Sequence, residues 1–342
     1  MRTIHADLIA AQQAPTGKDP YIHLDIDGVN YSSRLISLEH IEEPYRSQAT
    51  IVLANSDRYF DGVDLRGKEF FIGYGYNTTS GIRYCGDGDG SEATHTLWVK
   101  SQSLVSMEGK LVCILIAEGA WVRLREYNFL TTSDPPHFNI QFTATNTVHE
   151  LIELALEEAG YTLSDESIDD IISSFKPVFT VNPQSFESPA SIIYRLIRMT
   201  KCYIREQEGK DFEVIFPQDD DPVQEQYFSN NPPYFKEYVE KLNILVPNKI
   251  VVFCNINKET GEWDETMITG TAQDDAAIAR YGEVLECHSA PFISTQLDAD
   301  KRAAAILTRY RGEMLSGRLL LPFHDCRVEL YDKVQVMDYR GL

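Results

Sequence analysis

A change in the spacing of apolar residues between positions 295 and 336 constrains the fold of this chain most strongly. Thr295 followed three residues later by Asp298 predicts a helix start, because the hydroxyl accepts a hydrogen bond from a free backbone N–H and the carboxylate lies at the positive end of the helix dipole. One apolar face then recurs at helical spacing, opposite a basic face that we expect to point away from the protein. The apolar face is Ala303, Ile306, Leu307 and Tyr310, and the basic face is Lys301, Arg302, Arg309 and Arg311.

Beyond this helix, which we expect to end at Gly312 or Gly317, the apolar spacing changes to a period of two. The alternation runs through 318–323 and continues at Val328, Leu330, Val334 and Val336. Such alternation is typical of strands with one buried face. The sequence therefore predicts a helix packed onto strands.

The length and composition indicate a folded protein of two or three domains. The chain has 342 residues, of which 43% are hydrophobic and 24% are charged. Its longest apolar run, 111–117, is too short to span a membrane, and the N-terminus has no signal-peptide pattern. Six cysteines without a CxxC pair argue against a disulfide scaffold or a clustered metal site, and they favour a reducing compartment.

The charge argues against specific nucleic-acid binding. The chain has 31 Lys and Arg against 52 Asp and Glu, which gives a net charge of −21. This is the wrong sign for a protein that binds phosphate backbones. A negatively lined conduit for DNA would suit this composition, although an ordinary acidic surface is the commoner explanation.

The first region reads as a series of strands. Alternating runs at 21–26, 35–41 and 48–53 predict a β-meander, and Asp27-Gly28 is a favoured hairpin turn because both positions tolerate positive φ. Runs at 98–106 and 110–118 add two strands. Together they make a set large enough for a barrel.

Helical signals dominate the middle of the chain. Thr147 and Glu150 form a capping box, and Ser188-Pro189 is a cap followed by proline in the first turn of a second helix. A hairpin over 202–216 follows, and the acidic run 219–222 reads as an exposed linker. A second hairpin is predicted from 249–255 and 262–270, with its turn at 259–261.

Separated segments of the chain resemble the hub proteins of phage tails and related contractile injection systems. The resemblance rests on Ile26–Asn30, Tyr31–Leu38, Leu53–Asp57 and 64–75 near the start, and on Ala277–Gly282, Asp298–Tyr310 and Leu330–Gly341 near the end. It implies an α+β, mainly β fold with two β-barrel-like hub domains and a small inserted α/β domain. The implied boundaries are 1–144, 145–221 and 222–342.

The resemblance also implies a function. We expect a structural baseplate or tail-tip hub without enzymatic activity, forming a homotrimeric ring that adapts the sixfold tail tube to a threefold spike or fibre complex and lines the channel. The implied partners are the tail tube protein, the distal tail protein and a spike or tail-fibre protein. The protein would assemble in the host cytoplasm and reside in the virion tail. Some hubs carry an iron–sulphur cluster, but these cysteines lack that spacing, so we expect no cofactor.

Two other functions stay open. A carbohydrate-binding or wall-degrading β-protein of the tail tip would need a cleft with paired carboxylates, and no GxSxG, HExxH or P-loop motif occurs. A tube-forming subunit is weaker, because the double-barrel plan argues against it.

Two metal-binding patterns are weak. The acidic loop 86–92 fails the EF-hand pattern, and we expect a loop without calcium. Cys287-His288 and His324-Asp325-Cys326 would suit zinc only if they converged, and we assign no metal.

A group of aromatic residues set among Asn and Pro is the candidate inter-subunit contact. Aromatic side chains dominate many interfaces, although a cover over the linker is equally consistent with this pattern. The group is Tyr227, Phe228, Tyr234, Phe235 and Tyr238.

Overall fold

The computed structural model shows a mixed α+β protein in which strands predominate. It describes residues 1–15, 19–107, 109–127, 140–143, 145–165, 168–181, 187–242, 246–254, 268–290, 293, 295–313 and 315–340. Within these residues, none of the helices has both the length and the apolar character needed to span a membrane.

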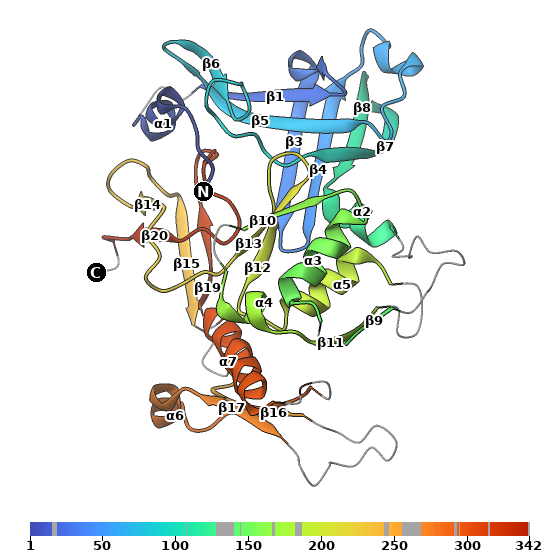
Figure 1. The fold of residues 1–342 in the computed structure, drawn as a ribbon. Helices are drawn as coiled ribbons and strands as arrows, with labels where there is room; N and C mark the ends of the chain where they lie inside the picture. The colour runs from blue at the N-terminus through green and yellow to red at the C-terminus, as the bar shows by residue number, and fades with distance from the viewer. Residues whose placement is uncertain are drawn as a thin grey trace.

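An eight-stranded antiparallel sheet forms the first region (Figure 1). Its order is β2-β1-β5-β7-β8-β4-β3, and β6 pairs with β5. The short helix α1 (Ala6–Gln13) contacts β5. The strands are β1 (Pro20–Ile26), β2 (Val29–Asn30), β3 (Leu35–Glu43), β4 (Arg46–Ala54), β5 (Glu69–Thr78), β6 (Gly81–Tyr84), β7 (Leu97–Met107) and β8 (Lys110–Glu118), with 3₁₀ turns at Ser32–Arg34 and Tyr59–Gly62.

The first region was expected to be a β-barrel-like domain. It is rich in strands, but among the described residues these strands form an open sheet and do not close into a barrel. The predicted strands and the turn at Asp27-Gly28 are present, with φ of 56° and 80°. The predicted meander is present for its second and third strands, since β3 pairs antiparallel with β4, and it is wrong for the first, since β1 pairs with β5. After β2 the chain turns, and the backbone of Leu24 holds this turn in place. Its N–H donates to the Ser32 hydroxyl, and its carbonyl accepts from the N–H of Tyr31.

The middle of the chain combines short helices with small sheets. The predicted capping box at Thr147 is present, and so is the Ser188 cap followed by proline. The predicted hairpin forms from β12 and β13, and β10 joins it. The elements are α2 (Ala120–Glu126), β9 (Ile140–Thr143), α3 (Val148–Glu157), β10 (Thr162–Asp165), α4 (Asp170–Ser174), β11 (Val178–Val181), α5 (Pro189–Ile197), β12 (Tyr203–Glu206) and β13 (Asp211–Ile215).

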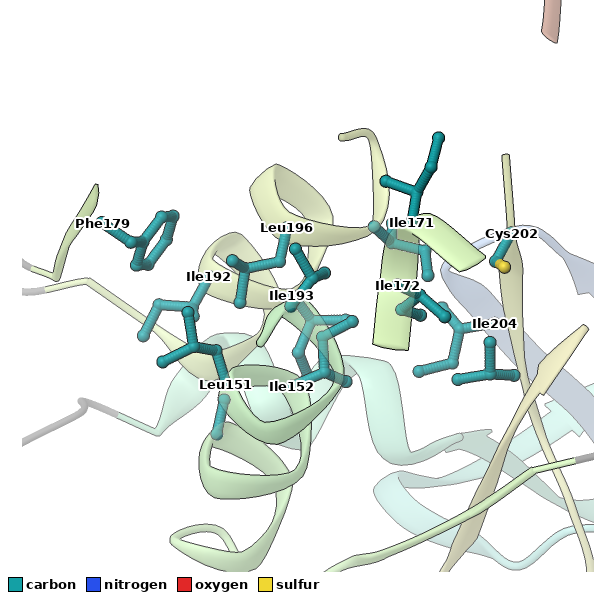
Figure 2. Close-up of a cluster of buried hydrophobic side chains, with 14 of the residues drawn as sticks. Leu151, Ile152, Ile171, Ile172, Phe179, Ile192, Ile193, Leu196, Cys202 and Ile204 are labelled. Atoms are coloured by element: carbon teal, nitrogen blue, oxygen red, sulfur yellow. The ribbon is translucent and has the colours of Figure 1, made fainter. Parts of the chain in front are cut away.

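Apolar side chains from α3, α4 and α5 interdigitate in this part of the molecule (Figure 2). Ile152, Ile193 and Leu196 are fully buried there. Their i, i+3, i+4 spacing on each helix creates the apolar faces, so burial of those faces drives the packing.

The last region holds three small sheets instead of the expected barrel. β14 pairs with β20, β15 pairs with β19, and β16 lies between β17 and β18. The elements are β14 (Glu225–Phe228), β15 (Glu237–Leu242), β16 (Lys249–Phe253), β17 (Thr269–Gln273), α6 (Asp275–Tyr281), β18 (Leu285–Ser289), α7 (Gln296–Glu313), β19 (Leu315–Leu320) and β20 (Val334–Met337).

Helix α7 begins as predicted, since the Thr295 hydroxyl accepts from the N–H of Asp298. Its buried apolar residues pack on β16 and β17, and Gly270 allows close approach to the helix backbone. The expectation for the basic face is wrong for Arg302 and Arg309. Arg302 donates to the carbonyl of Arg198, and Arg309 donates to those of Ile197 and Thr200, so both reach the end of α5 and the turn that follows it.

Three other segments differ from expectation or lie outside the described residues. Val328 and Leu330 lie in irregular backbone between β19 and β20, where a strand was predicted. β17 begins at Thr269, and the predicted turn at 259–261 lies outside the described residues. The acidic stretch 86–92 is a loop of turns and bends. The domain boundaries at 144 and 221 stay predictions.

Candidate assembly surface and supporting contacts

The β15–β19 ribbon is the candidate assembly surface. These two strands pair antiparallel with each other, and neither has another ladder partner among the described residues. Val239 lies opposite Arg318, and Glu237 lies opposite Leu320, so these four side chains share one face. Val239 and Leu320 are exposed at 37% and 41%. Exposed apolar residues on an open strand edge favour pairing with another chain.

The predicted aromatic contact group occupies several environments. Tyr227 is buried and its hydroxyl donates to Asp325 at 2.9 Å. Phe235 is also buried, beneath the guanidinium of Arg340. Phe228 and Tyr238 are half-buried, and Tyr234 is exposed at 39%. Contact of these residues with a neighbouring chain stays a prediction, and Tyr234 is the most available for it.

A cavity of about 670 Å³ lies between α5 and α7 and is rich in arginine. Arg302 donates to the carbonyl of Arg198, and Arg309 donates to the carbonyls of Thr200 and Ile197. None of the three arginines Arg198, Arg302 and Arg309 forms an ion pair with a carboxylate among the described residues. Burial, together with Arg309 and Arg198, lowers the pKa of Arg302 to about 10. The cavity therefore suits an anionic group.

Two tyrosines that line the same cavity have left-handed backbone. Tyr45 has φ of 63° and Tyr331 has φ of 72°. Such angles are costly for bulky residues and often occur at functional sites. The Tyr331 hydroxyl is also buried without a hydrogen-bond partner. The strained backbone of these two tyrosines and the buried Tyr331 hydroxyl without a hydrogen-bond partner distinguish the cavity from an ordinary surface depression.

A buried ion network fixes the middle of the chain to its last segment. The side chain of Arg205 is 4% exposed and lies 2.8 Å from Glu213 and 3.0 Å from Asp332. Arg2 lies 3.1 Å from Glu329, so the N-terminal segment joins the same network. These contacts tie three distant segments into one unit.

The structure does not bring the two candidate zinc groups together. The His324 ring lies against Tyr74 of β5, with ring centroids 3.8 Å apart and the planes tilted by 32°. Cys287 and His288 lie on β18, which pairs with β16 at the opposite end of the molecule from β5 (Figure 1). A different cluster, formed by His40, Glu42 and His95, has its ligand atoms close together. Its sequence signal is His-x-Glu at the end of the strand predicted over 35–41. The strand β3 extends to Glu43, which places both side chains on one face.

Comparison with known proteins gives a fold assignment. No protein-family model matches the chain, and no curated protein does either. Among solved structures, a tail protein from Neisseria meningitidis MC58 matches with a TM-score of 0.63 and 10% identity, covering 94% of this chain and 88% of that one. The chain has the fold of a tail protein.

A second tail protein supports this assignment. The 43 kDa tail protein of prophage MuSo2 from Shewanella oneidensis matches with a TM-score of 0.60 and 11% identity. The match covers 95% of this chain and 90% of that one. The tail-protein fold therefore includes the open sheet, the middle helices and the three small C-terminal sheets together.

Proposed function

We propose that this chain is a structural hub at the distal end of a phage-like tail, where it forms a homotrimeric ring between the tail tube and a spike or fibre complex. The fold likeness to two tail proteins over nearly the whole chain carries the proposal. Its location would be the virion tail, after assembly in the host cytoplasm. The distal tail protein would be a further neighbour.

The β15–β19 ribbon supports assembly through strand edges. A neighbouring chain that adds a strand there, or that covers Val239 and Leu320, would satisfy the open backbone groups and remove apolar surface from water. The arginine cavity adds electrostatic complementarity, because an acidic partner would present its carboxylates to the arginines that line it. Both features suit a protein whose surface is used for contacts with other subunits.

The net charge of −21 supports a channel-lining role without specific nucleic-acid binding. An acidic wall repels phosphates, so DNA could pass without adhering. Charge on the outer surface would instead keep the assembled ring soluble. The proposal requires only that part of this charge faces the ring centre.

A purely structural role is supported by the geometry around His95. The Ser47 hydroxyl lies 2.6 Å from Nε2 of His95, and Glu42 lies 3.9 Å from Nδ1. This arrangement resembles a Ser-His-Glu triad in its residue types, but Ser47 is buried. The cavity that Ser47 itself lines is about 20 Å³, which is enough for about one water molecule and far too small for a sugar. A wall-degrading role therefore finds little support there.

Light scattering and particle images of the purified full-length chain test the proposal. We expect a mass of about 117 kDa, three times the 38.9 kDa of one chain, in threefold rings with an open centre. Assembly on added tail tube would be equally consistent, because a hub can require its tube as a template. A monomer that ignores tail tube and releases products from peptidoglycan would overturn the proposal in favour of the wall-degrading alternative.

A further inference from the structure

Two histidines and a glutamate converge beneath the open sheet. His40 and Glu42 are two residues apart on β3 and so share one face, and His95 lies just before β7. The side chains of His40 and His95 are each 6% exposed, and that of Glu42 is 30% exposed. One ligand atom from each residue lies within 4.8 Å of the other two.

The distances are close to those of a bound metal ion. Oε1 of Glu42 lies 3.6 Å from Nδ1 of His40 and 3.9 Å from Nδ1 of His95. Zinc bonds of about 2.0–2.2 Å in a tetrahedron place neighbouring ligand atoms about 3.3–3.5 Å apart. Side-chain rotations that move each atom by less than about 1 Å would therefore complete the three protein ligands.

A single hydroxyl orients both imidazole rings. Oγ of Ser47 lies 2.6 Å from Nε2 of His95 and 3.3 Å from Nε2 of His40. When both rings donate from Nε2 to this oxygen, both Nδ1 lone pairs point toward the carboxylate of Glu42. In this tautomer Nδ1 of His40 accepts from the Tyr74 hydroxyl 2.6 Å away, and a cation would replace that donor while balancing the charge of the Glu42 carboxylate. Hydrogen bonds of this kind fix the tautomer of metal-binding histidines.

The cluster also has a route to solvent. His40 and Glu42 line a cavity of about 390 Å³ together with Tyr74, whose hydroxyl lies 2.6 Å from Nδ1 of His40. A water molecule from this cavity can occupy the remaining coordination position, as in sites with three protein ligands. Tyr74 would turn its hydroxyl toward that water when the ion takes the His40 nitrogen.

We propose that His40, Glu42 and His95 form a binding site for a divalent transition-metal ion of the Zn²⁺ type. Two imidazoles and one carboxylate suit Zn²⁺ and its neighbours in the first transition row better than Mg²⁺ or Ca²⁺, which prefer oxygen ligands. The ion would join β3 to the segment before β7. Glu206 of β12 lies 3.9 Å from Nε2 of His95, so the inserted hairpin borders the same site.

Titration of the chelator-treated full chain with Zn²⁺ and with Co²⁺ tests the site. We expect one ion per chain, a higher melting temperature with Zn²⁺, and a visible absorption band with Co²⁺. Glu42→Gln should weaken binding at least tenfold because it removes the charged ligand while keeping the side-chain shape. Ser47→Ala should weaken binding about 10- to 100-fold because both rings lose their orienting partner.

His288→Ala is the matched control, because His288 also lies beside a glutamate, 3.1 Å from Glu286, but outside the cluster. This variant should bind as the wild type does. Circular dichroism of each metal-free variant separates a folding defect from loss of a ligand. Failure of the wild type to bind either ion, or wild-type affinity in a folded Glu42→Gln variant, would overturn the proposal.

Discussion

The guanidinium of Arg205 lies 3.0 Å from the carboxylate of Asp332, which follows it by 127 residues, and both side chains are almost completely buried. Replacing Arg205 with alanine leaves Asp332 and Glu213 buried without this cation. Such a loss costs about 3–5 kcal/mol because it removes one partner of a buried ion pair. We therefore expect a large decrease in the free energy of unfolding, measured by urea denaturation followed by circular dichroism.

Arg66→Ala is the control for this experiment, because Arg66 pairs with Asp64 on the surface, away from the β15–β19 ribbon. Exposed ion pairs contribute little to stability, so the urea midpoint of this variant should stay close to the wild-type value. Equal midpoints for the Arg205 and Arg66 variants would contradict the importance of the buried network.

Leu320→Lys should prevent self-association without unfolding the chain. The leucine is 41% exposed on the β15–β19 ribbon, so the monomer tolerates a lysine there within about 0.5 kcal/mol. In a ring interface the same lysine would replace an apolar contact and carry a charge into a surface removed from water. Leu104→Lys provides the comparison, since Leu104 is 48% exposed on β7. Light scattering should show a loss of trimer only for Leu320→Lys, and trimers in both variants would exclude this ribbon face.

Gly270→Ala should destabilise the contact between β17 and α7. A Cβ at this position would lie 2.0 Å from the carbonyl oxygen of Ala299, so the helix must move. Overpacking of this kind typically costs about 1–3 kcal/mol. Thermal unfolding measures the loss, and Gly62→Ala serves as the control because a Cβ there meets nothing within 4 Å. Similar melting temperatures for the two variants would argue against the close helix contact.

Thiol labelling of the native chain should modify Cys287 alone. This cysteine is exposed, and the other five are buried. Burial raises the pKa of Cys113 to about 11 and that of Cys202 to about 12, so at pH 8 both remain thiols, which react poorly. Mass spectrometry should find one label per native chain and six after denaturation. Rapid labelling of Cys202 in the folded protein would contradict the packing around it.

Local signals in the sequence predicted individual elements well. The capping box at Thr147, the serine cap of α5 and the Asp27-Gly28 turn each depend on a few neighbouring residues, so their geometry is legible without tertiary context. The start of α7 at Thr295 was predicted for the same reason. The α+β, mainly β class, which the resemblance to tail hubs implied, is also confirmed.

Pairing between distant strands was less predictable. The register of β1 against β5 depends on packing across about 50 residues, and alternation alone does not specify a strand's neighbour. Arg302 and Arg309 have the helical positions of exposed residues, yet carbonyls from another part of the chain draw them inward. The cluster of His40, Glu42 and His95 was missed because a loop brings His95 to β3.

The core of the first sheet has a consequence for the order in which the protein matures during translation. Arg2 donates its backbone N–H to the carbonyl of Arg327, and fully buried Cys326 belongs to the same apolar cluster as Leu24 and Ile51. When only the residues of the first sheet have been synthesised, Cys326 is therefore still missing from the core of that sheet. The first sheet cannot complete its core until the ribosome has made Cys326, so a nascent copy cannot engage its neighbours in its final form before then.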